Sequence, residues 1–143
     1  MKQLYQLAGV GSHNPNDCFV QSLTNALGRP YTECFNLAKK SGWTATGICP
    51  SLTFKALRGL GFTAKILGYA RGARYLRFYT NPCDYKGYSK SVTLGTWLAS
   101  KEAQTGTFVV GISRHVMCVR NGIIFDAHCN KSTSRIITIF QLA

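Results

Sequence analysis

The sequence predicts an α+β fold in which helices come first and an antiparallel sheet comes second. Apolar residues recur at helical spacing in the first part of the chain, whereas short apolar runs typical of strands follow residue 106. The dipeptide Asn121-Gly122 stands between two such runs, and this is the strongest short signal for a β-hairpin. A chain of 143 residues is large enough for a hydrophobic core, so we expect a single domain over residues 1–143.

Three helices are predicted in the N-terminal half. The first runs from Phe19 to Leu27 and is closed by Gly28. Asn16 or Asp17 is its expected N-cap, because a short side-chain oxygen there can accept a hydrogen bond from a first-turn amide. The second helix begins at residue 31 and ends at residues 41–42, and the third begins at residues 50–51 and ends at residue 59.

The elements after the third helix are mostly strands. Residues 62–67 alternate like a strand, and residues 69–90 are irregular. Thr93 is expected to cap a short helix that carries Leu94, Trp97 and Leu98. Four strands of the antiparallel sheet are predicted at residues 107–112, 115–120, 123–127 and 135–142.

Charge and cysteine usage limit the class of protein. Lys and Arg number 17 against five acids, and the net charge of +12 favours nucleic acid or an acidic protein as a partner. No stretch approaches the roughly 20 apolar residues of a membrane helix, and the first eight residues are too short and polar for a signal peptide. We therefore expect an intracellular protein without a membrane partner, with reduced thiols and with no structural zinc or other cofactor.

Cys18, His115 and Asp126 are the candidate catalytic residues. A nucleophilic cysteine is activated by a helix N-terminus, by an imidazole that takes its proton and by a carboxylate that orients the imidazole. Cys18 opens the first predicted helix. A two-residue turn pairs Arg120 with Ile123, so His115 and Asp126 share one face of the hairpin as diagonal neighbours. The pattern predicts a Cys-His-Asp triad that attacks an acyl carbon.

Several polar residues near this triad have candidate roles. The amide of Cys18 is expected to supply one oxyanion-hole donor, and the side chain of Asn14 or Asn16 another. His128 is predicted opposite His115, so the cluster could instead bind a metal, although a supporting or solvent-facing role for His128 is simpler and no metal is predicted. His13 is an alternative base without an obvious orienting group.

Two segments, one at each end of the chain, carry a family resemblance. The first is the Asp-Cys pair with the apolar residues and the Ala-Leu-Gly-Arg-Pro-Tyr run that follow it, at residues 16–20, 23 and 26–31. The second is Gly-Thr-Phe-Val-Val with His-Val, Asn-Gly and Asp after it, at residues 106–110, 115–116, 121–122 and 126. Both segments resemble small bacteriophage proteins of the papain-like cysteine peptidase fold. The Asp-Cys pair is also similar to the peptidase domains of bacteriocin-exporting transporters.

The resemblance implies that Cys18 is the nucleophile, His115 the base and Asp126 the orienting group of an enzyme that cleaves a peptide or isopeptide bond. It implies a phage-encoded protein in the host cytoplasm or in the virion, acting on a peptide or protein substrate. The chain differs from the pattern at two positions. The transporter peptidases have an oxyanion-hole glutamine where this chain has Ser12, and the phage proteins often have glycine where it has Arg114.

A second interpretation is a non-catalytic basic protein that binds a host factor, nucleic acid or virion component on a retained peptidase scaffold. In the segment from Tyr69 to Lys90, cations alternate with aromatic rings, which could follow a phosphate backbone while stacking bases. A solvated basic loop whose rings pack on the domain is the plainer interpretation. The candidate binding residues are Arg71, Arg74, Arg77, Lys86 and Lys90.

Overall fold

The computed structural model describes residues 2–4, 17–44, 50–67, 93–112, 115–126 and 131–143. Helices dominate the first half of this part of the chain and strands the second half, so the predicted α+β class is confirmed. The elements in chain order are β1 (Lys2–Leu4), α1 (Cys18–Leu27), α2 (Tyr31–Lys40), α3 (Pro50–Gly59), β2 (Phe62–Leu67), α5 (Leu94–Leu98), the 3-10 helix η1 (Glu102–Gln104), β3 (Thr107–Ile112), β4 (His115–Arg120), β5 (Ile123–Phe125) and β6 (Ile136–Leu142).

The strands form one sheet in the order β1-β5-β4-β3-β6-β2. Five of them, from β5 to β2, pair antiparallel; the four that follow α5 were predicted to form an antiparallel sheet, whereas the pairing of β2 with β6 was not predicted. Strand β1 was not predicted, and it pairs parallel to β5 at the edge of the sheet. Three residues are too few to show an alternating pattern, so this strand is visible only in the structure.

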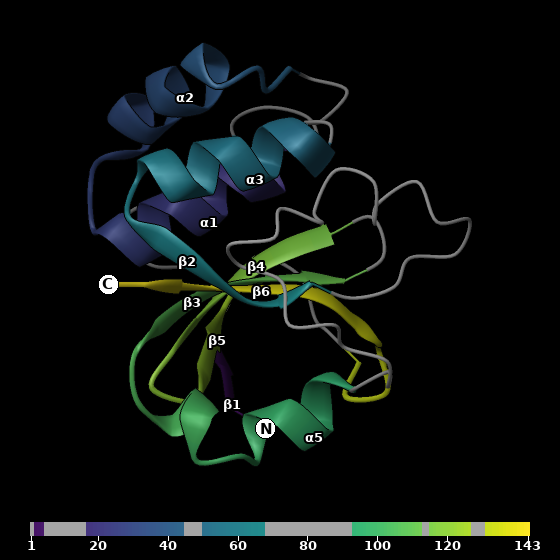
Figure 1. Ribbon diagram of the computed structural model, residues 1–143. Coiled ribbons are helices and arrows are strands. Elements are labelled where there is room, and N and C mark those ends of the chain that lie inside the picture. The colour runs from purple at the N-terminus through teal and green to yellow at the C-terminus, as the bar shows by residue number, and fades with distance from the viewer. Residues whose placement is uncertain (1, 5–16, 45–49, 68–92, 113–114, 127–130) are drawn as a thin grey trace.

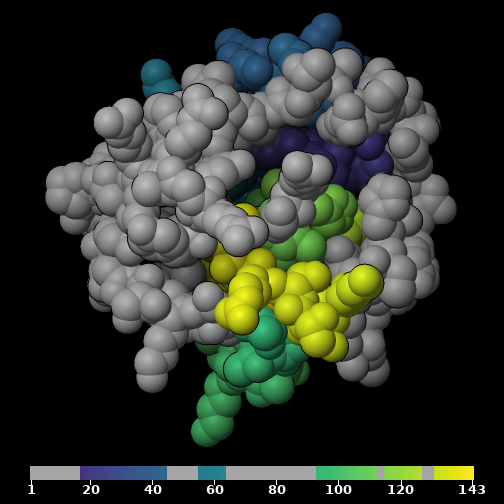
Figure 2. Space-filling view, turned by 90° about the vertical axis from the view of Figure 1, so that its right-hand side faces the viewer, coloured from purple at the N-terminus to yellow at the C-terminus, as the bar shows by residue number. Residues whose placement is uncertain are grey.

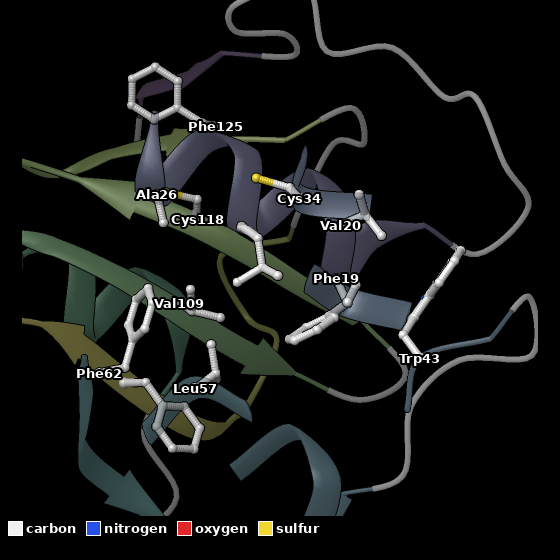
Figure 3. Packing of buried hydrophobic residues seen from close by; sticks show 13 residues of the cluster. Phe19, Val20, Ala26, Cys34, Trp43, Leu57, Phe62, Val109, Cys118 and Phe125 are labelled. Atoms are coloured by element: carbon white, nitrogen blue, oxygen red, sulfur yellow. The ribbon is translucent and has the colours of Figure 1, made fainter. Parts of the chain in front are cut away.

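Helices lie on both faces of the sheet (Figure 1). On one face, α1, α2 and α3 pack over a cluster that includes Phe19, Leu23, Val109, Cys118 and Phe140, part of which is labelled in Figure 3. On the other face, α5 and η1 cover a second cluster, and its fully buried members include Leu94, Phe108, Val110, Val119 and Ile139. Alternate residues of β3 and β4 therefore contribute to opposite clusters, as the period of a strand requires.

Helix α1 is buried along almost its whole length, because it lies between the sheet and α2. Every residue from Phe19 to Ala26 is buried, although several are polar. Two of these polar side chains bond to the carbonyl four residues back: Ser22 Oγ to Cys18 at 2.7 Å and Thr24 Oγ1 to Val20 at 2.9 Å. The helix ends at Gly28, whose φ of 65° is the left-handed conformation that glycine favours.

Most predicted element boundaries agree with the structure. Thr93 Oγ1 accepts a hydrogen bond from the amide of Thr96 at 3.3 Å and so caps α5 as expected. The strand predicted at 123–127 is shorter, since β5 ends at Phe125. Arg135 forms an isolated bridge to Thr93 instead of starting β6. Among the described helices, none is long and apolar enough to cross a membrane.

Candidate active site

Three elements bring the candidate catalytic residues to one place. Cys18 is the first residue of α1, His115 is the first residue of β4, and Asp126 directly follows β5. Helix α1 packs against β4, so its start lies over the same hairpin that carries the other two residues. In the space-filling view, purple α1 and the green strands reach the surface next to one another (Figure 2).

The β4–β5 hairpin has the register that the sequence predicted. Cys118 pairs with Phe125, and Arg120 with Ile123, around a two-residue turn. The turn residues Asn121 and Gly122 have φ angles of 49° and 79°, which is the type I′ pattern that Asn-Gly favours. The main-chain amide and side-chain oxygen of Asn121 both bond to Gly106, at 2.9 Å each. The turn therefore fixes which residues of the two strands share a face.

Replacing Gly122 with alanine is expected to lower the free energy of unfolding by about 1–2 kcal/mol, because a side chain is strained at this positive φ. The new Cβ would also lie 2.8 Å from Oε1 of Gln104, a side chain that is held in place because its Nε2 donates to the carbonyl of Leu98. Urea unfolding followed by circular dichroism measures the loss. Gly59→Ala is the control, since its Cβ would meet no atom within 4 Å. Equal stability of the Gly122 variant and the wild type would contradict the strain.

His115 and Asp126 are in direct contact across the hairpin. Nε2 of His115 lies 2.5 Å from Oδ2 of Asp126. The carboxylate side chain is 5% exposed and the imidazole 17% exposed, so little water screens the pair. The diagonal proximity predicted from the turn is therefore present.

The environment of His115 favours its charged form. Burial alone lowers the pKa of His115, because it removes water from the imidazolium. Hydrogen bonds to Asp126 and to Cys18, together with electrostatic interactions with both groups, outweigh this effect and raise the pKa from 6.5 to about 9. The imidazole is therefore positively charged at neutral pH, and it lies between a carboxylate and the Cys18 thiol.

The start of α1 differs from the prediction. Asp17 is the N-cap residue by position, but its side chain makes no capping hydrogen bond. Its buried carboxylate instead accepts hydrogen bonds from Gln21 Nε2 at 2.6 Å and from the Tyr31 hydroxyl at 2.7 Å. The Gln21 bond spans one helical turn and could have been read from the i, i+4 spacing. Tyr31 belongs to α2, and no sequence pattern indicated this contact.

The other end of α1 is tied to the hairpin beside Asp126. Asn25 Nδ2 donates to the carbonyl of Phe125, and Arg120 Nη1 donates to the carbonyl of Asn25, each at 3.4 Å. The guanidinium of Arg120 also lies 5.5 Å from the centre of the Phe125 ring. These long-range contacts orient α1 against β4 and β5, and they were not predicted.

Two further cysteines of the described chain lie in the core. Cys34 and Cys118 are fully buried and belong to the cluster beneath α1 (Figure 3). Burial raises the pKa of Cys34, and it raises the pKa of Cys118 to about 12 against the opposing charge of Arg120. Both thiols are therefore neutral and inaccessible. Cys18, in contrast, is partly exposed.

Other residues singled out in the sequence lie outside the described part of the chain. Within that part, no three His, Cys, Asp or Glu side chains are arranged to hold a metal ion. The residues outside it are the oxyanion candidates Asn14 and Asn16, the histidines His13 and His128, the positions Ser12 and Arg114, and the basic residues Arg71, Arg74, Arg77, Lys86 and Lys90. No known protein family matches the chain, and neither a curated protein nor a solved structure is significantly similar to it.

Proposed function

We propose that the chain is a thiol hydrolase of the papain-like cysteine peptidase fold that cleaves a peptide or isopeptide bond. The observation that carries this proposal is the position of His115, whose imidazole bonds both to the buried carboxylate of Asp126 and to the thiol of Cys18. A base held between a nucleophile and an orienting group is the arrangement that acyl transfer requires. The order of elements, with a buried helix that opens on the cysteine followed by a sheet that carries histidine and aspartate, is consistent with this fold.

The proposed reaction has two acyl-transfer steps. The thiol proton of Cys18 resides on His115, and the thiolate sulfur adds to the carbonyl carbon of the substrate. His115 then gives its proton to the departing amine, which leaves a thioester on Cys18. Water, deprotonated by His115, attacks the thioester and releases the acid and the thiol. Asp126 stays ionised and keeps the ring oriented, while the Cys18 amide is the proposed first donor to the oxyanion.

Alkylation by iodoacetamide tests the proposed thiolate–imidazolium pair. We expect Cys18 to react at a rate that changes little between pH 6 and pH 8, because its proton is already on His115. An ordinary thiol instead reacts about tenfold faster for each pH unit in this range. Peptide mass spectrometry follows each cysteine separately, and the buried Cys34 and Cys118 serve as slow references in the same sample. A tenfold rise per pH unit at Cys18 of the folded protein would contradict the proposal.

Acyl transfer can be tested without knowledge of the natural substrate. The activated ester p-nitrophenyl acetate should acetylate Cys18 and release nitrophenol in a burst, followed by slow turnover as water hydrolyses the thioester. Cys18→Ser should lack the burst, and urea-unfolded protein is the control for an unassisted thiol. Release at the rate of the unfolded control would favour the non-catalytic interpretation, for which the net charge of +12 is the main support.

A further inference from the structure

A basic groove lies between the end of α2 and the second half of α3. Its volume is about 360 Å³, and its lining residues are Lys40, Ser41, Lys55, Ala56, Gly59 and Leu60. Lys40 is the last residue of α2 and Lys55 lies in the middle of α3, so each helix contributes one lysine to the lining. The groove shares no residue with the candidate active site, and the proposed chemistry gives it no role.

The groove is positively charged. Lys40 and Lys55 are exposed, and the exposed Lys39 and Arg58 stand next to its lining residues in the sequence. None of the four acidic residues that the structure describes lines it. Both helices end at the groove, and the C-terminal dipole of each contributes about half a negative charge. The two lining lysines outweigh these dipoles, so the field in the groove attracts anions.

The residues that line the groove favour one class of anionic partner over the others. Lysine is depleted in protein–protein interfaces, which are enriched in aromatic residues and methionine, and the described residues of the lining include neither. Single-stranded nucleic acid is held by aromatic side chains on which bases stack, and among the described residues none that lines the groove is aromatic. Lysines without aromatic neighbours can bind the phosphates of a duplex, because the bases of a duplex already stack on one another and need no aromatic side chain.

We propose that the groove between α2 and α3 binds the phosphate backbone of a nucleic-acid duplex, with Lys40 and Lys55 as its phosphate contacts. Binding there is independent of base sequence, since side chains that contact phosphates carry no sequence information directly. It is also independent of the thiol chemistry, so failure of either proposal leaves the other standing.

Gly59 allows the charge of the groove to be changed without disturbing the fold. A Cβ at this position meets no atom within 4 Å. Gly59→Glu therefore introduces a carboxylate between the two lysines, and Gly59→Gln introduces a neutral side chain of the same size. We expect the Glu variant to bind a fluorescent 20-base-pair DNA about tenfold more weakly than the Gln variant at 50 mM salt, measured by fluorescence anisotropy. Equal affinities of the two variants would overturn the proposal.

The salt dependence identifies the contacts. In Lys40→Gln/Lys55→Gln, the slope of log K against log salt should fall by about 1 for each lysine. The control is Lys101→Gln/Lys131→Gln, which changes the net charge equally at two exposed lysines outside the groove. If the control variant reduces the slope as much as Lys40→Gln/Lys55→Gln does, the charge of the whole protein, and not the groove, attracts DNA.

The choice of partner is tested in the same assay. Single-stranded DNA of equal length and poly-glutamate are compared with the duplex at several salt concentrations. Tighter binding of the duplex, lost in Gly59→Glu, supports the proposal. Tighter binding of single strands or of poly-glutamate, or no binding of the duplex at 50 mM salt, overturns it.

Discussion

His115→Ala is expected to slow the alkylation of Cys18 at pH 6 by about 10- to 100-fold. Without the imidazolium, the thiol must ionise unaided, and an ordinary cysteine is ionised in roughly one molecule in 300 at this pH. The rate difference is smaller than this fraction suggests, because the more stable thiolate of the wild type is a weaker nucleophile than the thiolate of the variant. The proposed hydrolysis should fall by about 1,000-fold or more, since the variant loses both the base and the acid.

The measurement compares the alkylation rate of Cys18 in the two proteins from pH 5.5 to pH 9.5. In the variant, the rate should rise tenfold per pH unit, cross the wild-type rate between about pH 7 and pH 8 and level off above about pH 8.5. Val116→Ala controls for a shortened side chain at this end of β4, because Val116 is the next residue and is also partly buried. The same nearly flat profile in His115→Ala and wild type would show that the imidazole does not activate the thiol.

Asp126→Asn is expected to remove most of a pH-dependent contribution to stability. The pKa of His115 is raised from 6.5 to about 9 on folding, so the folded protein holds this proton more tightly than the unfolded chain does. The resulting stabilisation is fully present below pH 6.5, declines as the pH rises and is lost above about pH 9. This stabilisation amounts to about 3 kcal/mol. Asparagine is chosen because it can keep the hydrogen bond to His115 while it removes the negative charge.

Urea unfolding at half-unit steps from pH 6 to pH 9.5 tests this expectation. Asp126→Asn should be about 2–3 kcal/mol less stable than the wild type at pH 6, and this difference should shrink towards zero by pH 9.5, where the wild-type imidazole has lost its charge. His115→Ala is a second arm, because it lacks the titrating group, and its difference from the wild type should shrink in the same way. Parallel curves for all three proteins would mean that the His115–Asp126 pair does not titrate in this range.

The sequence was most informative where structure depends on neighbouring residues. The Asn-Gly turn predicted the hairpin register, and from it the shared face of His115 and Asp126, because strand geometry leaves only one partner for each residue. Helix α2 has the predicted boundaries because its start and stop are coded within the chain, by Pro30 before it and Gly42 after it.

Features that depend on distant residues were not predictable. Strand β1 forms only because β5 offers a free edge, and its three residues carry no pattern of their own. The buried carboxylate of Asp17 binds the side chains of Gln21 and of Tyr31 in α2, and not a first-turn amide, so a local capping rule gave the wrong partner. The links from α1 to the hairpin through Asn25 and Arg120 likewise require the tertiary structure.

The turn that fixes the register also suggests how distant relatives of this chain can be recognised. A two-residue turn cannot absorb an extra or a missing residue. Adding or deleting one residue in either strand would therefore shift the register and place His115 and Asp126 on opposite faces. Substitutions elsewhere in the hairpin leave their relation intact. The search pattern is a histidine and an aspartate with ten residues between them, Asn-Gly within those ten, and a cysteine at a helix start far upstream. We expect this pattern to remain recognisable in relatives whose overall sequence similarity has been lost.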